Sequence, residues 1–335
     1  MRAAFVNASA LGDWKGVLAQ RGLDYSQIDA LLKVPNTMGD TYGHQVIDLR
    51  KFVETVETAG KIKNRSGMSW SVGLASNYAK RGKVGHAILG SRTLGTAFHR
   101  LVKYYPLIQD HTDLNLKVGE SWTTLGYRIL DPDIWPRTED ALYSLGVFAS
   151  FVKTVAPDAW NSVEISVEAD KDLIRNDLSD VVQTNVIYGA ESNAIRFPTQ
   201  LMNRDFGLLP AVDNDAINRL SRLLTEKTRK LPMSDRTRHL IFQGLSVGRV
   251  NQDHVAKELG VSRRTLRRKL AVEGESFQSI LDECRIRAAM LEFRVSPGQS
   301  LSEMALKLGY SEHSTFSRAF MRWAGIAPQE FRKLM

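Results

Sequence analysis

The sequence predicts an α+β N-terminal domain followed by an all-α domain of two helix-turn-helix units joined by a central helix. Three observations support this fold class. The 335 residues exceed what one hydrophobic core usually organises. An eight-residue pattern occurs twice near the C-terminus, and the excess positive charge is confined to the last third: from Lys230 onward, 18 Lys and Arg face 11 Asp and Glu, against 27 and 26 before it.

The composition indicates a soluble globular protein and excludes several classes. Hydrophobic residues make up 43% and charged residues 24% of the chain. Met1 to Trp14 is too weakly apolar for a signal peptide, and no apolar run reaches 18 residues, so we expect a cytoplasmic protein with no membrane contact. A single cysteine, Cys284, excludes a disulfide framework or paired-cysteine zinc site. Histidines 44, 86, 99 and 111 lack metal-ligand spacing. We expect no catalytic residues, metal or cofactor, and no enzymatic activity.

The repeated pattern predicts two helix-turn-helix units. Val255 to Ser262 reappears as Met304 to Ser311, 49 residues later, with Ala, Leu, Gly and Ser at matching places. The small alanine permits a close helix crossing, the glycine suits the left-handed conformation after a helix, and the serine suits the N-cap of the next helix. Ser300-Leu301-Ser302-Glu303 has the pattern of a capping box at the entry to the second unit.

The helix after the first turn presents a basic face. Leu266 and Leu270 should face the core, which places Arg264, Arg267 and Arg268 on the opposite side. Three arginines that converge without acidic residues between them repel one another unless a polyanion offsets their charge. The pattern favours DNA contact over the alternative, a solvated basic surface.

The helix after the second turn carries fewer charges. We expect Phe316, Phe320 and Trp323 to form its apolar stripe. Ser314, Ser317, Arg318 and Met321 should project the other way, and His313 should lie in the first turn. An exposed polar face with no DNA contact is the alternative here. The two units should therefore contribute unequally to binding.

One helix from Ser276 to Arg294 should connect the units, because apolar residues follow helical spacing until Ser296-Pro297-Gly298. A helix of about 18 residues is roughly 27 Å long. Successive major-groove segments are roughly 34 Å apart, so the helix could hold both reading helices on one face of a duplex. Cys284 on this helix is expected to be a small core residue.

At this point the sequence resembles a known family. Gly309-Tyr310-Ser311, the run from Phe316 to Trp323 and the run from Gly325 to Arg332 closely resemble the signature of AraC/XylS-type transcription regulators, and the resemblance covers about Asp235 to Met335. It implies double-stranded promoter DNA and RNA polymerase as partners and an activator role. The DNA-binding residues expected are Arg263, Arg264, Arg267, Arg268, His313, Ser314, Ser317, Arg318 and Arg322.

The first two hundred residues predict a mixed domain. Helices are expected over Trp14 to Leu32, His44 to Glu57, Ser69 to Lys80, Thr93 to Ile108 and Ala141 to Val155 and near Leu173, and strands over Leu114 to Val118, Trp122 to Leu130, Val163 to Val167 and Ala194 to Phe197. The basic run Lys80 to Lys83 is interpreted as a solvated turn. Tyr104 to Leu107 and Ala194 to Pro198 resemble the arabinose-binding-like sensor domain of one subgroup of these regulators.

That resemblance implies a small-molecule effector. Its candidate contacts are Trp122, Tyr127, Trp135 and Phe148, although aromatic residues among strands more often belong to the core. The predicted organisation is a regulatory domain over 1–210, a linker helix over 211–233 and a DNA-binding domain over 234–335. Ile217, Leu220, Leu224 and Leu231 in the linker are near coiled-coil spacing, so it either carries a homodimer contact or packs on its own domain.

The sequence therefore predicts an effector-controlled, sequence-specific transcription regulator. One alternative is a ligand-independent architectural protein that reads DNA shape. Another is a catalytic protein that uses the basic module for targeting, such as an alkyl-group acceptor, but that requires a reactive cysteine in the N-terminal part, which has none.

Overall fold

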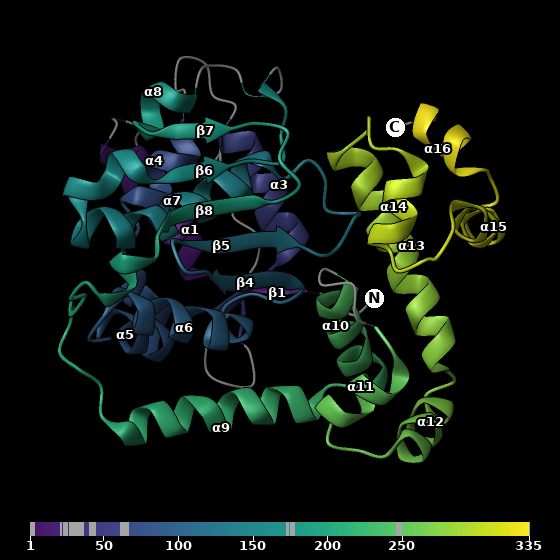
Figure 1. The fold of residues 1–335 in the computed structure, drawn as a ribbon. Coiled ribbons are helices and arrows are strands. Elements are labelled where there is room, and N and C mark those ends of the chain that lie inside the picture. The colour runs from purple at the N-terminus through teal and green to yellow at the C-terminus, as the bar shows by residue number, and fades with distance from the viewer. Residues whose placement is uncertain are drawn as a thin grey trace. The chain divides into compact units, whose positions relative to one another are not determined.

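The computed structural model describes residues 4–334 apart from 21, 23–25, 27–36, 40–44, 61–66, 172–173, 175–177 and 246–249. The chain divides into two compact units (Figure 1). The first comprises Met1–Ile129 and Ile134–Thr225, and the second comprises Leu130–Asp133 and Glu226–Met335. Among the described residues, no helix combines the length and apolarity needed to cross a bilayer.

Two sheets organise the first unit. A small antiparallel sheet has the order β1-β3-β2, from β1 (Phe5–Asn7), β2 (Met38–Gly39) and β3 (Gln45–Asp48). A five-stranded sheet has the order β4-β5-β8-β6-β7. Its strands are β4 (Thr112–Val118), β5 (Trp122–Ile129), β6 (Glu164–Ser166), β7 (Asn185–Ile187) and β8 (Asn193–Pro198). Within it, β6 and β7 pair in parallel, and the other pairs are antiparallel.

Helices of the first unit complete its core. They are α1 (Ser9–Gln20), α3 (Leu49–Gly60), α4 (Met68–Leu74), α5 (Gly82–Leu89), α6 (Leu94–Tyr104), α7 (Thr138–Val155) and α8 (Leu178–Val182). Short 3₁₀ helices are η1 (Tyr78–Arg81), η2 (Tyr105–Leu107), η3 (Pro157–Ser162) and η5 (Thr199–Asn203). Most of α7 is buried, as its apolar sequence requires.

Two glycines let α4 and α7 approach at backbone distance. A Cβ atom added to Gly73 would lie 2.2 Å from the carbonyl oxygen of Tyr143, and one added to Gly146 would lie 2.5 Å from the carbonyl oxygen of Trp70. Only residues without side chains fit at both crossing points, because the obstructing atoms belong to the backbone. The seven-residue helix α4 is thereby held against the longest helix of the unit.

Several expected elements differ in extent. His44 to Glu57 was expected to be helical, but β3 precedes α3, because Val46 and Ile47 pair with β1 before the helix begins. The helix expected over Thr93 to Ile108 ends at Tyr104, before Pro106. Much of the segment from Trp14 to Leu32 lies outside the described residues, as does Leu173.

The linker forms helix α9 (Asn214–Lys230), and its apolar side packs on the first unit. Leu220 is buried, and Ile217 and Leu224 are half-buried against the same core. The hydroxyl groups of Tyr104 on α6 and Ser221 on α9 lie 2.9 Å apart. The structure favours the second of the two interpretations of this segment, packing on its own domain.

The second unit consists of seven helices among its described residues: α10 (Met233–Leu245), α11 (Gln252–Glu258), α12 (Arg263–Val272), α13 (Phe277–Val295), α14 (Leu301–Lys307), α15 (His313–Ala324) and α16 (Pro328–Leu334). They enclose two separate hydrophobic cores. Ile280, Leu281 and Cys284 of α13 belong to the first, and Ala289 and Phe293 belong to the second. The α+β and all-α parts of the predicted fold class are confirmed.

The α4–α7 crossing gives a stability prediction. Gly73→Ala must push the two backbones apart, and we expect it to lower the free energy of unfolding by about 2 kcal/mol or more, as overpacking does. Gly16→Ala is the matched control, because Gly16 lies inside α1 with no atom within 4 Å of the added Cβ. It should gain up to about 1 kcal/mol from helix propensity. Urea unfolding of both variants measures this, and equal effects would contradict the close approach.

Candidate nucleic-acid interface and interior cavity

Helix α12 begins where its sequence predicts and buries the predicted face. Gly260 adopts the left-handed conformation after α11 with φ of 66°. The Ser262 hydroxyl then caps α12 by accepting a hydrogen bond from the backbone N–H of Thr265 at 3.1 Å. Leu266 and Leu270 are fully buried in the first core. The helix therefore has a fixed start and a fixed rotation, and its opposite face lies at the surface.

The arginines of α12 fall into two groups. Arg263 is held by α11, because its Nε donates to Gln252 at 3.0 Å and its Nη1 lies 3.4 Å from an Asp253 oxygen. Arg264, Arg267 and Arg268 are exposed and form no ion pair within the part of the chain that the structure describes. These three, called the α12 arginine face below, are free to meet an external anion.

Helix α15 differs from the expectation at both ends. Glu312, not Ser311, is the N-cap, and its side chain forms no cap hydrogen bond. Phe316 and Phe320 are buried, but Trp323 is 44% exposed. The reason is that Phe331 of α16 lies against Phe320, with ring centroids 5.2 Å apart, and closes the second core at the end of the stripe.

The polar residues of α15 have mixed surroundings. His313 and Arg318 are exposed, Ser317 is half-buried, and Ser314 donates a hydrogen bond to Glu312. Arg322 donates to Asp282 of α13 at 3.1 Å. It therefore ties α15 to α13, although its side chain stays 66% exposed. The second helix-turn-helix unit presents fewer free cationic groups than the α12 arginine face.

Arg285 of α13 fastens the second helix-turn-helix unit. Its Nε donates to the carbonyl oxygen of Leu308 at 2.9 Å, and its Nη2 donates to that of Gly309 at 2.8 Å. The guanidinium also lies 4.4 Å from the ring centroid of Tyr310. Carbonyls at the end of α14 have no partner within their helix, so a cation there both caps the helix and complements its dipole. Sequence reasoning missed this role because those carbonyls lie 23 and 24 residues from Arg285.

Arg238 performs the matching task for the first helix-turn-helix unit. This side chain of α10 meets Asp235, Glu275 and Glu283 at 2.9 to 3.0 Å. Burial alone would lower the pKa of Arg238, but these carboxylates raise it above its ordinary value. Helix α10, the turn before α13 and α13 itself are held by one guanidinium. Cys284 is buried nearby, and burial raises the pKa of its thiol well above the usual range, as suits a core residue.

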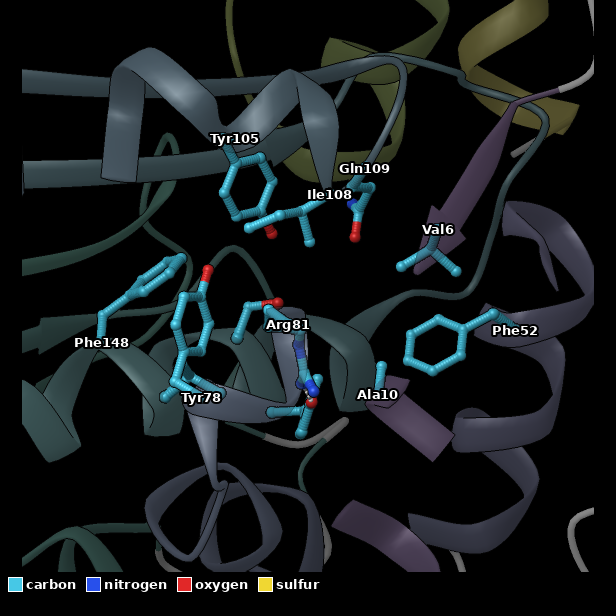
Figure 2. A pocket seen from close by; sticks show the side chains of 12 residues that line it. Val6, Ala10, Phe52, Tyr78, Arg81, Tyr105, Ile108, Gln109 and Phe148 are labelled. Atoms are coloured by element: carbon cyan, nitrogen blue, oxygen red, sulfur yellow. Dashed lines mark hydrogen bonds between the residues drawn. The ribbon is translucent and has the colours of Figure 1, made fainter. Parts of the chain in front are cut away.

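The first unit contains a small interior cavity of about 30 Å³ (Figure 2). Its walls come from β1, α1, α3, η1, α7 and the segment that follows α6. The lining residues are Val6, Ala10, Phe52, Tyr78, Arg81, Tyr105, Ile108, Gln109, Tyr143, Ser144, Val147 and Phe148. This volume has room for about two water molecules.

The four proposed effector contacts are scattered. Phe148 lines the cavity, and Tyr127 lies behind it, donating a hydrogen bond to Asp140 at 2.7 Å. Trp122 and Trp135 are 36% and 39% exposed and do not line it. Trp122 lies under the Arg196 guanidinium, 4.4 Å from its ring centroid. The structure does not bring the four together.

Arg81 is the charged group of the cavity. It is only 3% exposed, so the expectation of a solvated turn at Lys80 to Lys83 was wrong for this residue. Its Nη2 donates to Asp13 at 2.7 Å and to the Tyr143 hydroxyl at 2.6 Å. Burial alone would lower the pKa of Arg81, but Tyr143 and Asp13 raise it. The charge persists and is compensated within the wall.

Two further polar groups face this region with unused capacity. Gln109 Nε2 donates to Thr112 at 2.7 Å and to Tyr127 at 2.9 Å, which fixes the amide orientation. Figure 2 shows its oxygen turned toward the cavity. The hydroxyl of Tyr78 is buried with no hydrogen-bond partner among the described residues. Burial raises the pKa of Tyr78 above its ordinary value, so the hydroxyl stays protonated.

Two family models cover most of the chain. The one described as the arabinose-binding domain of AraC transcription regulator matches residues 22–206, more than half of the sequence. The one described as a helix-turn-helix domain matches residues 255–334. The chain belongs to the AraC family of transcription regulators. The resemblance inferred from the sequence is thereby confirmed, and the protein is a DNA-binding transcription regulator with an arabinose-binding-like N-terminal domain.

Individual proteins are similar to this chain over most of its length. This AraC-family regulator is 27% identical over 281 residues to an uncharacterized HTH-type transcriptional regulator of Mycobacterium tuberculosis, covering 82% of this chain and 80% of the relative. It is 25% identical to the ornithine utilization regulator of Pseudomonas aeruginosa, covering 78% and 77%. It is 20% identical to the solved transcriptional regulator CdpR from Pseudomonas aeruginosa, with a TM-score of 0.38 and coverage of 97% and 96%.

The Arg285 contacts give a prediction about how strongly DNA affinity depends on the spacing between the two half-sites of a binding site. Arg285→Met removes the cap from α14, and we expect affinity for a site selected from random duplexes to fall about tenfold. Affinity for a site with one extra base pair between its half-sites should fall much less, because the second helix-turn-helix unit is no longer held in one orientation. Lys257→Met, at an exposed α11 position, is the charge-matched control and should affect both sites equally. Fluorescence anisotropy titrations of the wild-type protein and both variants measure the six affinities. An unchanged spacing preference in Arg285→Met would contradict the fastening role.

The α12 arginine face predicts unequal effects along one helix. We expect Arg267→Ala or Arg268→Ala to weaken binding to the selected site by about 1 to 3 kcal/mol and to relax preference at one base pair. Arg263→Ala should cost less, since its guanidinium is already held by α11. Competition titrations at several salt concentrations separate base from phosphate contacts. The assignment fails if Arg263→Ala proves the most damaging of the three.

Proposed function

We propose that this AraC-family protein is a sequence-specific transcription activator whose N-terminal unit binds a small-molecule effector. The α12 arginine face is the main support for DNA binding. Its side chains are exposed and have no acidic partners among the described residues. Arginine is the side chain best suited to bidentate contacts with guanine and to phosphate contacts. The proposed DNA contacts are those expected from the sequence, with Arg263 and Arg322 acting mainly through neighbouring helices.

A single chain supplies two reading helices, and we propose that it spans two successive major-groove segments. Helix α13 belongs to both cores, so both helix-turn-helix units are attached to one stiff rod. The apolar side of α9 is occupied by its own unit, which favours a monomer as the minimal DNA-binding species. A homodimer would add a second site. Sedimentation of the chain with and without DNA distinguishes the two.

Effector control is proposed from the interior cavity and the regulatory role we assign to the first 210 residues. The cavity contains the buried hydroxyl of Tyr78, which has no hydrogen-bond partner among the described residues. Such a group lowers the stability of the fold unless some state of the protein supplies it with a hydrogen bond. A ligand that binds one conformational state better than another shifts the population toward it. Activation through RNA polymerase is the output that the family resemblance favours. We propose no catalytic role for any residue.

A binding and transcription experiment tests the proposal. We expect the full chain to protect a selected duplex in excess competitor DNA at least about a thousandfold better than random sequence. Added to purified RNA polymerase, it should raise transcription from a promoter carrying that site. The variant with Arg264, Arg267 and Arg268 all changed to Ala should lose both effects. Equal affinity for all duplexes would instead indicate an architectural protein.

A further inference from the structure

We propose that the interior cavity of the first unit is the effector site, and that it takes an uncharged ring compound carrying one hydroxyl group, of the phenol class. The inference rests on the proposed effector control and names the ligand chemistry. Its observations are the charge balance of the wall, its polar groups with unused capacity, and its aromatic lining.

Charge balance excludes ions. Arg81 is the cation of the wall, and its charge is already met by Asp13 at 2.7 Å. Tyr143 also donates to Asp13, at 3.0 Å. An anionic ligand would have to compete with a buried carboxylate for Arg81. A cationic ligand would have to draw that carboxylate away from the guanidinium. A neutral molecule disturbs neither, so burial of the ligand costs no unpaired charge.

The unused polar groups suit one hydroxyl. Gln109 offers its amide oxygen, an acceptor, because both amide hydrogens are directed to Thr112 and Tyr127. Tyr78 offers a buried hydroxyl that can donate. The wall therefore offers a ligand hydroxyl one acceptor, Gln109, and one donor, Tyr78. A sugar would bury several hydroxyls against a wall made mostly of aromatic and aliphatic side chains.

The rest of the lining suits a flat apolar body. Five rings border the space, from Phe52, Tyr78, Tyr105, Tyr143 and Phe148. Tyr105 and Phe148 already meet edge to face, with centroids 6.4 Å apart and planes at 66°. An aromatic ligand would extend this arrangement, because edge-to-face contact is the favoured geometry between rings.

The size of the cavity links binding to the rest of the chain. A cavity that holds benzene measures about 150 Å³, several times the volume here, so a ring must displace lining side chains. Tyr105 is one of them, and Figure 2 shows it on the side opposite Tyr78 and Phe148. The adjacent residue, Tyr104, contacts Ser221 of α9, the helix that continues into the second unit. Ring entry would therefore alter one of the contacts that hold α9.

Calorimetric titration of the full chain with matched probes tests the ligand class. We expect phenol to bind at least about tenfold more tightly than toluene, benzoate, benzylammonium or arabinose. Toluene as tight as phenol would show that no hydroxyl is recognised, and tighter binding of benzoate, benzylammonium or arabinose would favour an anion, cation or sugar site. Any of these, or no heat with phenol, overturns the proposal.

Variants locate the site independently of DNA binding. Tyr78→Phe should weaken phenol about tenfold without changing toluene, and should raise the unfolding midpoint by about 2 °C, because it removes a buried unsatisfied hydroxyl. Loss of stability together with unchanged phenol affinity would overturn the assignment. Ala10→Leu should fill the space and abolish binding, with circular dichroism as the folding control.

Tyr104→Phe tests whether ligand binding can be separated from its effect on DNA affinity. It removes the hydroxyl contact with Ser221 but leaves the cavity lining intact, so phenol affinity should persist while the effect of phenol on DNA affinity disappears. If phenol binds wild-type protein but never changes DNA affinity, the cavity is a ligand site and effector control fails. If phenol does not bind, the site fails while DNA recognition stands.

Discussion

The DNA-binding module depends on one constraint, the division of helix α13 between two hydrophobic cores. Its first half supplies Ile280, Leu281 and Cys284 to one core, and its second half supplies Ala289 and Phe293 to the other. Half-buried Ala288 touches both. Because an α-helix is stiff over this length, each core fixes one helix-turn-helix unit to a common rod. Arg238 and Arg285 reinforce the two attachments with charged hydrogen bonds.

Most of this arrangement could be predicted, because it is local in sequence. The left-handed glycines, the Ser262 cap and the capping box of Ser300 with Glu303 are set within four residues of chain. The wrong prediction that Trp323 is buried has another cause. Whether Trp323 is covered depends on Phe331, and that contact is determined by how α16 folds back, which helical periodicity does not contain.

The N-terminal unit was less predictable for a physical reason. Strands of two to four residues, such as β2 and β3, are too short to show alternation. The cavity draws on residues from six elements, and Arg81 in its wall pairs with Asp13, 68 residues away in the chain. In sequence, Arg81 lies between lysines and looks solvated. Only the tertiary structure distinguishes a buried arginine with a carboxylate partner from an exposed one.

The cavity region also contains unfavourable burial. Besides Tyr78, one oxygen of Asp140 is buried without a partner among the described residues, and burial raises the pKa of Asp140 to about 6. Between about pH 4 and 6 the folded chain therefore holds a proton that the unfolded chain has released, so this group's contribution to stability falls as pH rises through that window. At neutral pH both groups lower the stability of the folded chain. Buried polar atoms without a partner also occur elsewhere among the described residues, at the indole nitrogens of Trp14 and Trp70, so such costs are not confined to the cavity; only Tyr78 carries one within the lining itself, where a ligand could supply the missing partner.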